Sequence, residues 1–282
     1  MSHPAVETLA RYRGPLGLDS PWESPGAPLA SKAEAAGLVL ALADRWHPGS
    51  GDPRDRLYRA LITRAPGNLS EDDLVEADRV LAWESRQRAI VVPGTPNARV
   101  GETDLVLVKG DLTRLGIDAV VNAANDALLG CFVPHHACID NAFHAAAGPR
   151  LRDDCGRIAE LCVRPEPTGS AKATRAYHLP SRFVLHTVGP IVRGRVPRDS
   201  DRLLLEGCYQ ACLELATALH GVRSLGFCSI STGVFGYPIE AAAPIAVAAV
   251  EGWLRAHPGV FDRIVFDLWS DQDLGIYKEV LR

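Results

Sequence analysis

The spacing of apolar residues divides the chain into two regions. Between residues 31 and 90 apolar positions recur every three or four residues, which predicts amphipathic helices. Ser31 and Glu34 form a capping-box pattern before the first helix, Pro53 can open a second, and Ser70 can cap a third. The preceding thirty residues are rich in Pro and Gly and have little periodicity, so we expect an irregular arm there.

After the expected linker PGTPNA (93–98), short apolar runs alternate with helical patterns. The expected strands are 105–109, 118–123, 173–179, 183–189, 224–230 and 262–269. The expected helices are about 136–147, a segment after Pro149, 200–219, 238–256 and 273–281. Alternation of this kind is typical of an α/β fold with a mixed sheet covered on both faces. We therefore expect an arm and helical extension over residues 1–95 and an α/β domain over residues 96–282.

Composition narrows the classes of function. The chain has 282 residues, 47% of them hydrophobic, and can bury a substantial core. A net charge of -4 disfavours binding to a nucleic-acid backbone. No apolar run is long enough to span a bilayer, and the first residues lack the apolar segment of a secretory signal. We expect a cytoplasmic protein with seven reduced cysteines, bound to neither nucleic acid nor membrane.

The segment GCFVPHHAC (130–138) brings together side chains that bind soft metals. Cys131, His136 and Cys138 are spaced so that thiolate and imidazole can surround one zinc ion. Three protein ligands with an open fourth position are typical of catalytic zinc, whereas structural zinc usually has four. His135 can replace His136 or act as a fourth ligand. The alternative is a pair of core thiols beside an unrelated histidine.

A glycine-containing loop, Ser231–Gly236, follows an expected strand and precedes an expected helix from Pro238. Glycines let the backbone approach a ligand closely, and successive N–H groups can form a nest for phosphate oxygens. The positive end of the following helix points to the same place. The alternative is a tight turn between strand and helix.

Short polar residues follow two other expected strands. Asp111 and Leu112 come after the first, and Asn125 comes after the second. The carboxyl ends of strands are where α/β sheets bind ligands; there an Asp can accept from an exocyclic amine and an Asn can bond a sugar hydroxyl. The alternative is ordinary turn chemistry. Asp140 is either a general base or a helix N-terminal carboxylate, and we expect His144, one turn later, to be a satisfied packing residue.

Four segments together resemble the macrodomain family, an ADP-ribose-binding fold. They are VKGDLTRLGIDAVVNAAN, IDNAFHAAAGPRL, GSAKATRAYHLPSRFVLHTVGP and ISTGVFGYP, in family order across residues 104–282. The resemblance implies a three-layer α/β/α macrodomain with a mixed central sheet. The loop GCFVPHHAC stands where most hydrolytic macrodomains have a glycine-rich loop. This departure is similar to the zinc-containing subclass, which also has a helical N-terminal extension.

The resemblance implies a role for each matching position. One Zn²⁺ ion would be held by Cys131, His136 and Cys138. Asp140 matches the catalytic aspartate of hydrolytic macrodomains, and Asp140 or Asn125 would orient the water. The positions implied to bind ADP-ribose are Asp111 and Leu112 at adenine, Asn125 at the distal ribose, and Ser231, Thr232, Gly233, Val234 and Phe235 at the diphosphate.

The function implied is zinc-dependent, glycosidase-type hydrolysis that removes mono-ADP-ribose from a modified protein and releases ADP-ribose. Zinc would either activate water or act as a Lewis acid on the ribose or leaving oxygen. The alternatives are a reader that binds ADP-ribose without cleaving it, an O-acetyl-ADP-ribose deacetylase, and a zinc ion that only braces the loop. Relatives of the zinc-containing subclass look associated with sirtuin-type ADP-ribosyl transferases, which implies a functional link to such an enzyme.

Overall fold

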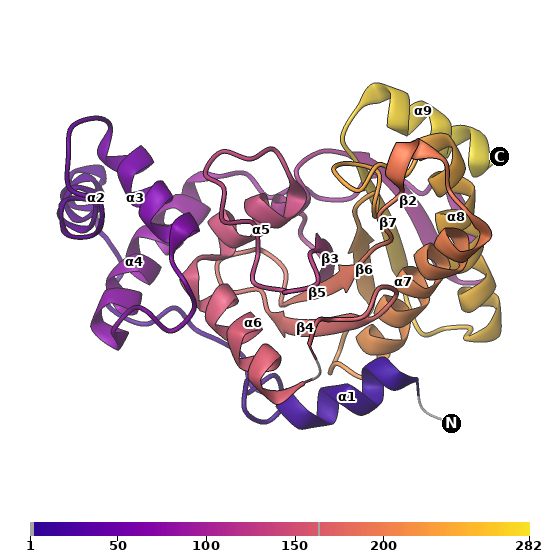
Figure 1. Ribbon diagram of the computed structural model, residues 1–282, viewed down its shortest axis with the longest axis horizontal. Coiled ribbons are helices and arrows are strands. Elements are labelled where there is room, and N and C mark those ends of the chain that lie inside the picture. Colours follow the sequence, from indigo (N-terminus) through magenta and orange to yellow (C-terminus); the bar gives the residue numbers. More distant parts are fainter. Residues whose placement is uncertain (1–2, 163) are drawn as a thin grey trace.

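The computed structural model describes residues 3–162 and 164–282 and shows a central sheet between layers of helices, with a helical region at one side (Figure 1). The helices are α1 (Pro4–Tyr12), α2 (Lys32–Trp46), α3 (Pro53–Thr63), α4 (Glu71–Gln87), α5 (Ile139–Ala147), α6 (Pro149–Leu161), α7 (Asp199–Thr217), α8 (Ile239–Ala256) and α9 (Asp271–Val280), with 3-10 turns η1 (Leu112–Arg114) and η2 (Arg193–Arg195). The strands are β1 (Ala98–Val100), β2 (Thr103–Lys109), β3 (Ala119–Ala124), β4 (Ala171–Arg175), β5 (Phe183–Val188), β6 (Ser224–Phe227) and β7 (Arg263–Leu268).

The sheet has seven strands in the order β1-β2-β7-β6-β3-β5-β4. The two edge strands, β1 and β4, are antiparallel to their neighbours and the inner strands are parallel. All six residues of β5 are buried, as expected of an inner strand covered on both faces. In Figure 1, α5 and α6 lie on one side of the sheet and α7 and α8 on the other. The expected α/β/α fold with a mixed sheet is confirmed.

The parallel strands place one set of loops at a common edge. The segments that follow β2, β3, β6 and β7 all leave the sheet at its carboxyl edge, because these strands run in the same direction. Those segments begin at Gly110, Asn125, Cys228 and Trp269. The sheet therefore gathers most of the candidate ligand-binding residues at one edge.

The irregular arm expected before residue 31 is wrong for Pro4–Tyr12, which form α1. Pro4 occupies the first helical turn, and the His3 side chain accepts a hydrogen bond from the Ala5 N–H. Leu9 and Tyr12 are buried against the sheet domain. Ala5, Leu9 and Tyr12 stand at helical spacing behind Pro4, a local signal that the Pro- and Gly-rich residues after it outweighed in the sequence pattern.

Several element boundaries also differ from those expected. The expected linker ends inside β1, which begins at Ala98. α5 begins at Ile139 and not near residue 136, because the preceding residues form a loop. The strand expected over 173–179 occupies 171–175, and the strand expected over 224–230 ends at 227.

Helices α2, α3 and α4 form where the capping signals predicted, and Arg152 joins this extension to the sheet domain. The Arg152 side chain is 3% exposed. Its guanidinium donates to the carbonyls of Leu61, Ile62 and Arg64 at the end of α3, and to that of Leu129 before α5. The predicted boundary near residue 95 stays a prediction. No helix in the described part of the chain is both long and apolar enough to cross a bilayer.

Candidate functional site

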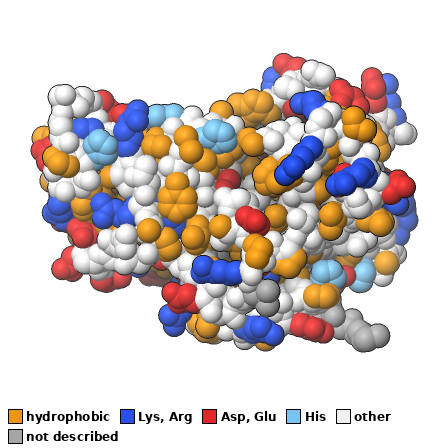
Figure 2. Space-filling view, viewed as in Figure 1, with side chains coloured by type: hydrophobic (Ala, Val, Ile, Leu, Met, Phe, Trp, Pro, Cys, Tyr) orange, Lys and Arg blue, Asp and Glu red, His pale blue; other side chains and the backbone are white. Residues whose placement is uncertain are grey.

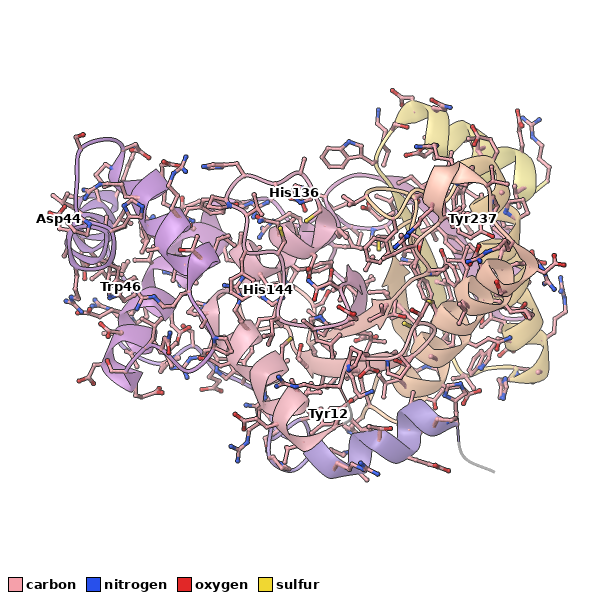
Figure 3. The ribbon with its side chains drawn as sticks, in the orientation of Figure 1. Tyr12, Asp44, Trp46, His136, His144 and Tyr237 are labelled. Carbon is pink, nitrogen blue, oxygen red and sulfur yellow. The ribbon has the colours of Figure 1, made fainter. Side chains whose placement is uncertain are left out.

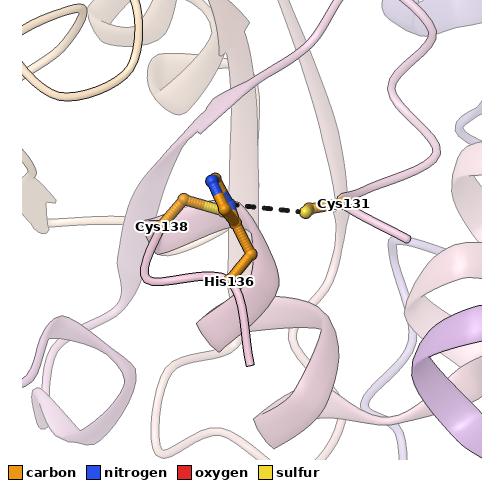
Figure 4. A group of neighbouring side chains, drawn as sticks. All are labelled: Cys131, His136 and Cys138. Carbon is orange, nitrogen blue, oxygen red and sulfur yellow. Dashed lines mark hydrogen bonds between the residues drawn. The ribbon is translucent and has the colours of Figure 1, made fainter. Parts of the chain in front are cut away.

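The three soft metal donors converge on the loop before α5. One donor atom from each of Cys131, His136 and Cys138 lies within 4.8 Å of the other two. Cys131 Sγ is 3.6 Å from His136 Nδ1 (Figure 4). Figure 2 shows a histidine among hydrophobic side chains on the surface above α5, and Figure 3 places His136 there. The donor set fits one zinc ion with a coordination position left open.

Two features of this loop bear on the alternatives for the metal. His135 does not join the cluster, because its Nε2 pairs with Asp55 Oδ1 at 2.7 Å. His135 therefore lies outside the group of three converging donors, and its role as a ligand stays a prediction. Burial raises the pKa of the Cys138 thiol to about 11, and the nearby Cys131 adds to the rise. A bound metal would therefore have to displace a proton from Cys138.

Asp140 lies in the first turn of α5 and is 5% exposed. Its Oδ1 accepts from Asn122 Nδ2 at 2.8 Å, and its Oδ2 lies 3.4 Å from Asn125 Nδ2. Asn122 in turn lies 3.1 Å from Nδ1 of His186, its register partner on β5. Burial lowers the pKa of His186 to about 3, so this imidazole is neutral. Burial raises the pKa of Asp140 to about 6, while the Asn122 hydrogen bond opposes the rise.

His144 is buried beside Asp140, but it is not the satisfied packing residue that was expected. Neither ring nitrogen has a hydrogen-bond partner among the described residues, and Nε2 is 3.7 Å from Asp140 Oδ1. Burial holds the pKa of His144 well below its usual range, so the ring is neutral. The loop over residues 130–138, called the cluster loop below, crosses over His144. A Cβ on Gly130 would lie 2.4 Å from the His144 ring, so this crossing requires glycine at position 130.

Asp111 stands at the end of β2 with both carboxylate oxygens engaged. Oδ1 accepts from the Thr113 N–H at 3.0 Å, and Oδ2 accepts from Arg88 Nη2 at 2.6 Å. The hydrogen bond from the Thr113 N–H is the turn interaction that was given above as the alternative role of Asp111. The arginine comes from the segment after α4, so the extension reaches this end of the site as well. The side chain of Leu112 is buried in the core.

Sequence reasoning missed Trp269. It was expected to end a strand, but β7 stops at Leu268 and leaves the indole 85% exposed. Leu268 pairs in register with Lys109, so Trp269 leaves the sheet beside the segment that carries Asp111. The sequence signal that could have identified Trp269 as a candidate ligand-binding residue is a tryptophan at the carboxyl end of an expected strand, followed by polar residues.

The loop 231–236 has the form of an anion nest. Ser231 is buried with φ +67°, and its Oγ has no partner among the described residues. The Gly236 N–H donates a hydrogen bond to the Gly233 carbonyl, and the Thr232 hydroxyl donates one to the Ser229 carbonyl. Within the described chain, the N–H groups of residues 233, 234 and 235 make no hydrogen bond. Gly233, Val234 and Phe235 therefore leave donors free for an anion at the start of α8.

The buried carboxyl group of Asp267, on β7, should make the free energy of unfolding depend on pH. Burial, with the Asp111 carboxylate nearby, raises the pKa of Asp267 to about 7. The folded protein holds this proton after the unfolded chain has released it. The contribution of Asp267 to the free energy of unfolding should therefore be fully present below about pH 4 and be lost as pH rises to about 7.

Replacing Asp267 by Asn should remove this loss. The difference in unfolding free energy, Asp267→Asn minus wild type, should be about 1–3 kcal/mol larger at pH 8 than at pH 5. Urea unfolding of both proteins at the two pH values measures the difference. Equal differences at both pH values would show that Asp267 is ionised throughout.

Comparison with known proteins places the chain among macrodomain proteins. A Macro domain family model matches residues 121–246. A protein-ADP-ribose hydrolase of Treponema medium is 43% identical over 83% of this chain and 90% of its own. One from Staphylococcus aureus strain MSSA476 is 40% identical over 82% of this chain and 86% of its own.

Two solved structures share the fold. The Oceanobacillus iheyensis macrodomain with ADP has a TM-score of 0.59 and 38% identity, covering 65% of this chain and 92% of its own. The Trypanosoma brucei macrodomain in complex with ADP-ribose has a TM-score of 0.60 and 30% identity, covering 83% and 97%. Sequence and fold agree, and the chain belongs to the macrodomain family.

Proposed function

We propose that this protein is a hydrolase that removes mono-ADP-ribose from modified proteins. One observation carries the proposal: the buried carboxylate of Asp140 is held by Asn122 and lies beside Asn125 and the three-donor cluster. A carboxylate with a raised pKa beside convergent polar groups is typical of a catalytic site. The relatives from Treponema and Staphylococcus, named protein-ADP-ribose hydrolases, support the same assignment.

ADP-ribose would lie along the carboxyl edge of the sheet. Asp111 would accept from the adenine amine in competition with Arg88, beside the Leu112 backbone, and Trp269 would stack on the ring. The free N–H groups of the loop 231–235 would bind the diphosphate. Asn125 would bond the distal ribose and bring it next to Asp140. Binding energy gained along this edge would position the distal C1 carbon.

Hydrolysis breaks the bond between the distal C1 carbon and the oxygen of the modified side chain, and water adds to C1. Asp140 would orient that water, accept its proton and pass a proton to the departing side-chain oxygen, while the bond from Asn122 fixes the carboxylate. Asn125 would orient the ribose. The transition state has the oxocarbenium character of glycoside hydrolysis.

One Zn²⁺ ion belongs to the same proposal. Cys131, His136 and Cys138 would hold it, which their convergence and donor chemistry support. When bound, zinc would supply Lewis-acid or water-activating chemistry at this loop. A zinc ion that only braces the loop would affect stability and ADP-ribose binding together. The sirtuin-type transferase that would make the substrate and the cytoplasmic location stay predictions.

The anion nest can be tested at Gly233. A side chain at this position meets no atom within 4 Å, so Gly233→Glu should fold normally. It should weaken binding of free ADP-ribose by about 10- to 100-fold, because its carboxylate would repel the diphosphate near the surface. Calorimetric titration measures the affinity, with Gly233→Gln as a control of similar size and no charge. Equal affinities of the two variants would place the diphosphate elsewhere.

A further inference from the structure

Helix α3 of the N-terminal extension contacts the cluster loop directly. The Tyr58 hydroxyl donates to Asn141 Oδ1 at 2.6 Å and accepts from the His135 N–H at 3.1 Å. The Tyr58 ring also stacks on the His135 imidazole, with ring centroids 4.7 Å apart. One side chain from α3 therefore bonds both the residue before His136 and a residue on the first turn of α5.

Asn141 carries this contact across the loop. Because its Oδ1 accepts from Tyr58, its Nδ2 faces the loop and donates to the Val133 carbonyl at 2.8 Å. The Asn141 backbone N–H donates to Cys138 Sγ at 3.3 Å. The Tyr58 hydroxyl thus fixes which way an amide points, and that amide holds the middle of the loop between Cys131 and Cys138.

Asp55 provides a second contact from the same helix. Its Oδ1 pairs with His135 Nε2 at 2.7 Å, and its Oδ2 accepts from Arg59 one turn later, also at 2.7 Å. His135 has φ +60°, a left-handed conformation that is unfavourable for a residue other than glycine. A residue in this conformation needs surrounding contacts to hold it. Tyr58 and Asp55 supply them at the position directly before His136.

We infer that α3 is a positioning element of the cluster loop, with Tyr58 and Asp55 keeping Cys131, His136 and Cys138 converged. The inference rests on the proposed function, because the three donors are taken to hold a zinc ion used in turnover. Groups that orient metal ligands typically affect metal affinity about 10- to 100-fold. The extension is in this way part of the candidate active site, although none of its residues is a proposed zinc ligand.

The test is Tyr58→Phe, which removes one hydroxyl and keeps the ring. Zinc transfer from the loaded protein to a chromogenic chelator should be about 10-fold faster in the variant, and kcat should fall while the affinity for free ADP-ribose stays unchanged. Asp55→Asn should change zinc transfer in the same direction. The matched control is Tyr12→Phe, because the Tyr12 hydroxyl accepts from the Ala173 N–H at 3.0 Å and lies far from His136 in Figure 3.

The control should lower the melting temperature and leave the rate of zinc transfer as in the wild type. Equal zinc-transfer rates in the wild type and Tyr58→Phe would overturn the inference, as would a wild-type protein that takes up no zinc. Equal acceleration by Tyr12→Phe would also overturn it, because the effect would then reflect general loss of stability. A wild-type protein that holds zinc but releases no ADP-ribose would refute the proposed function, and the rates of zinc transfer would still decide the inference.

Discussion

Asp140→Asn should slow release of ADP-ribose from a modified protein by about 10²- to 10⁴-fold, the range typical of losing a general base. The amide has nearly the shape of the carboxylate, so it can occupy the same place at the start of α5. It cannot accept a proton from water. The affinity for free ADP-ribose should change little, because adenine and diphosphate are proposed to bind elsewhere on the edge. Single-turnover release and calorimetry measure the two quantities separately.

Asp154→Asn is the matched control for that experiment. Asp154 is another largely buried carboxyl, and burial raises its pKa to about 7. It accepts from the Tyr177 hydroxyl at 2.7 Å, outside the proposed site. Its variant should keep the wild-type rate of release. Asp140→Asn with wild-type turnover would remove Asp140 from the chemistry.

Removing zinc should lower turnover by about 10²- to 10³-fold, because a Lewis acid contributes several kcal/mol to stabilisation of a transition state. Turnover should return when zinc is added back to the stripped protein. Cys131→Ser should show the same loss without recovery, because one of three donors is gone. Release of ADP-ribose and bound zinc are measured on the same preparations.

Cys162→Ser provides the control for loss of a thiol. Cys162 is a partly buried free cysteine at the end of α6 and outside the three-donor cluster. Its variant should keep both zinc and turnover. Full turnover in protein shown to be free of zinc would contradict a catalytic metal. A parallel fall of ADP-ribose affinity and turnover on stripping would indicate an ion that only braces the loop.

The fold was predictable because its signals are local. Capping residues and helical periodicity located α2, α3 and α4, and alternating short apolar runs located most strands of the sheet. β1 was missed because three residues beside the expected linker show no strand pattern. α1 was missed although Ala5, Leu9 and Tyr12 stand at helical spacing, because Pro and Gly dominate the residues that follow it.

The sequence predicted which residues make up the candidate site better than it predicted the contacts between them. The spacing of Cys131, His136 and Cys138 indicated their convergence, but it also left His135 open as a ligand. The structure pairs His135 with Asp55, which lies 80 residues earlier in the chain. The pairing of Arg88 with Asp111 likewise depends on how α4 packs against α5 and α6. No local pattern encodes contacts between separate elements, so they had to come from the structure.

The most direct test of the central claim is a time course of ADP-ribose release from mono-ADP-ribosylated protein. Ester-linked and serine-linked acceptors would be incubated separately with wild-type, zinc-loaded enzyme. Chromatography quantifies free ADP-ribose, and mass spectrometry follows the acceptor. We expect multiple turnovers on at least one linkage, with one ADP-ribose released for each side chain restored. Tight binding of ADP-ribose without release from either linkage would contradict it and identify a reader.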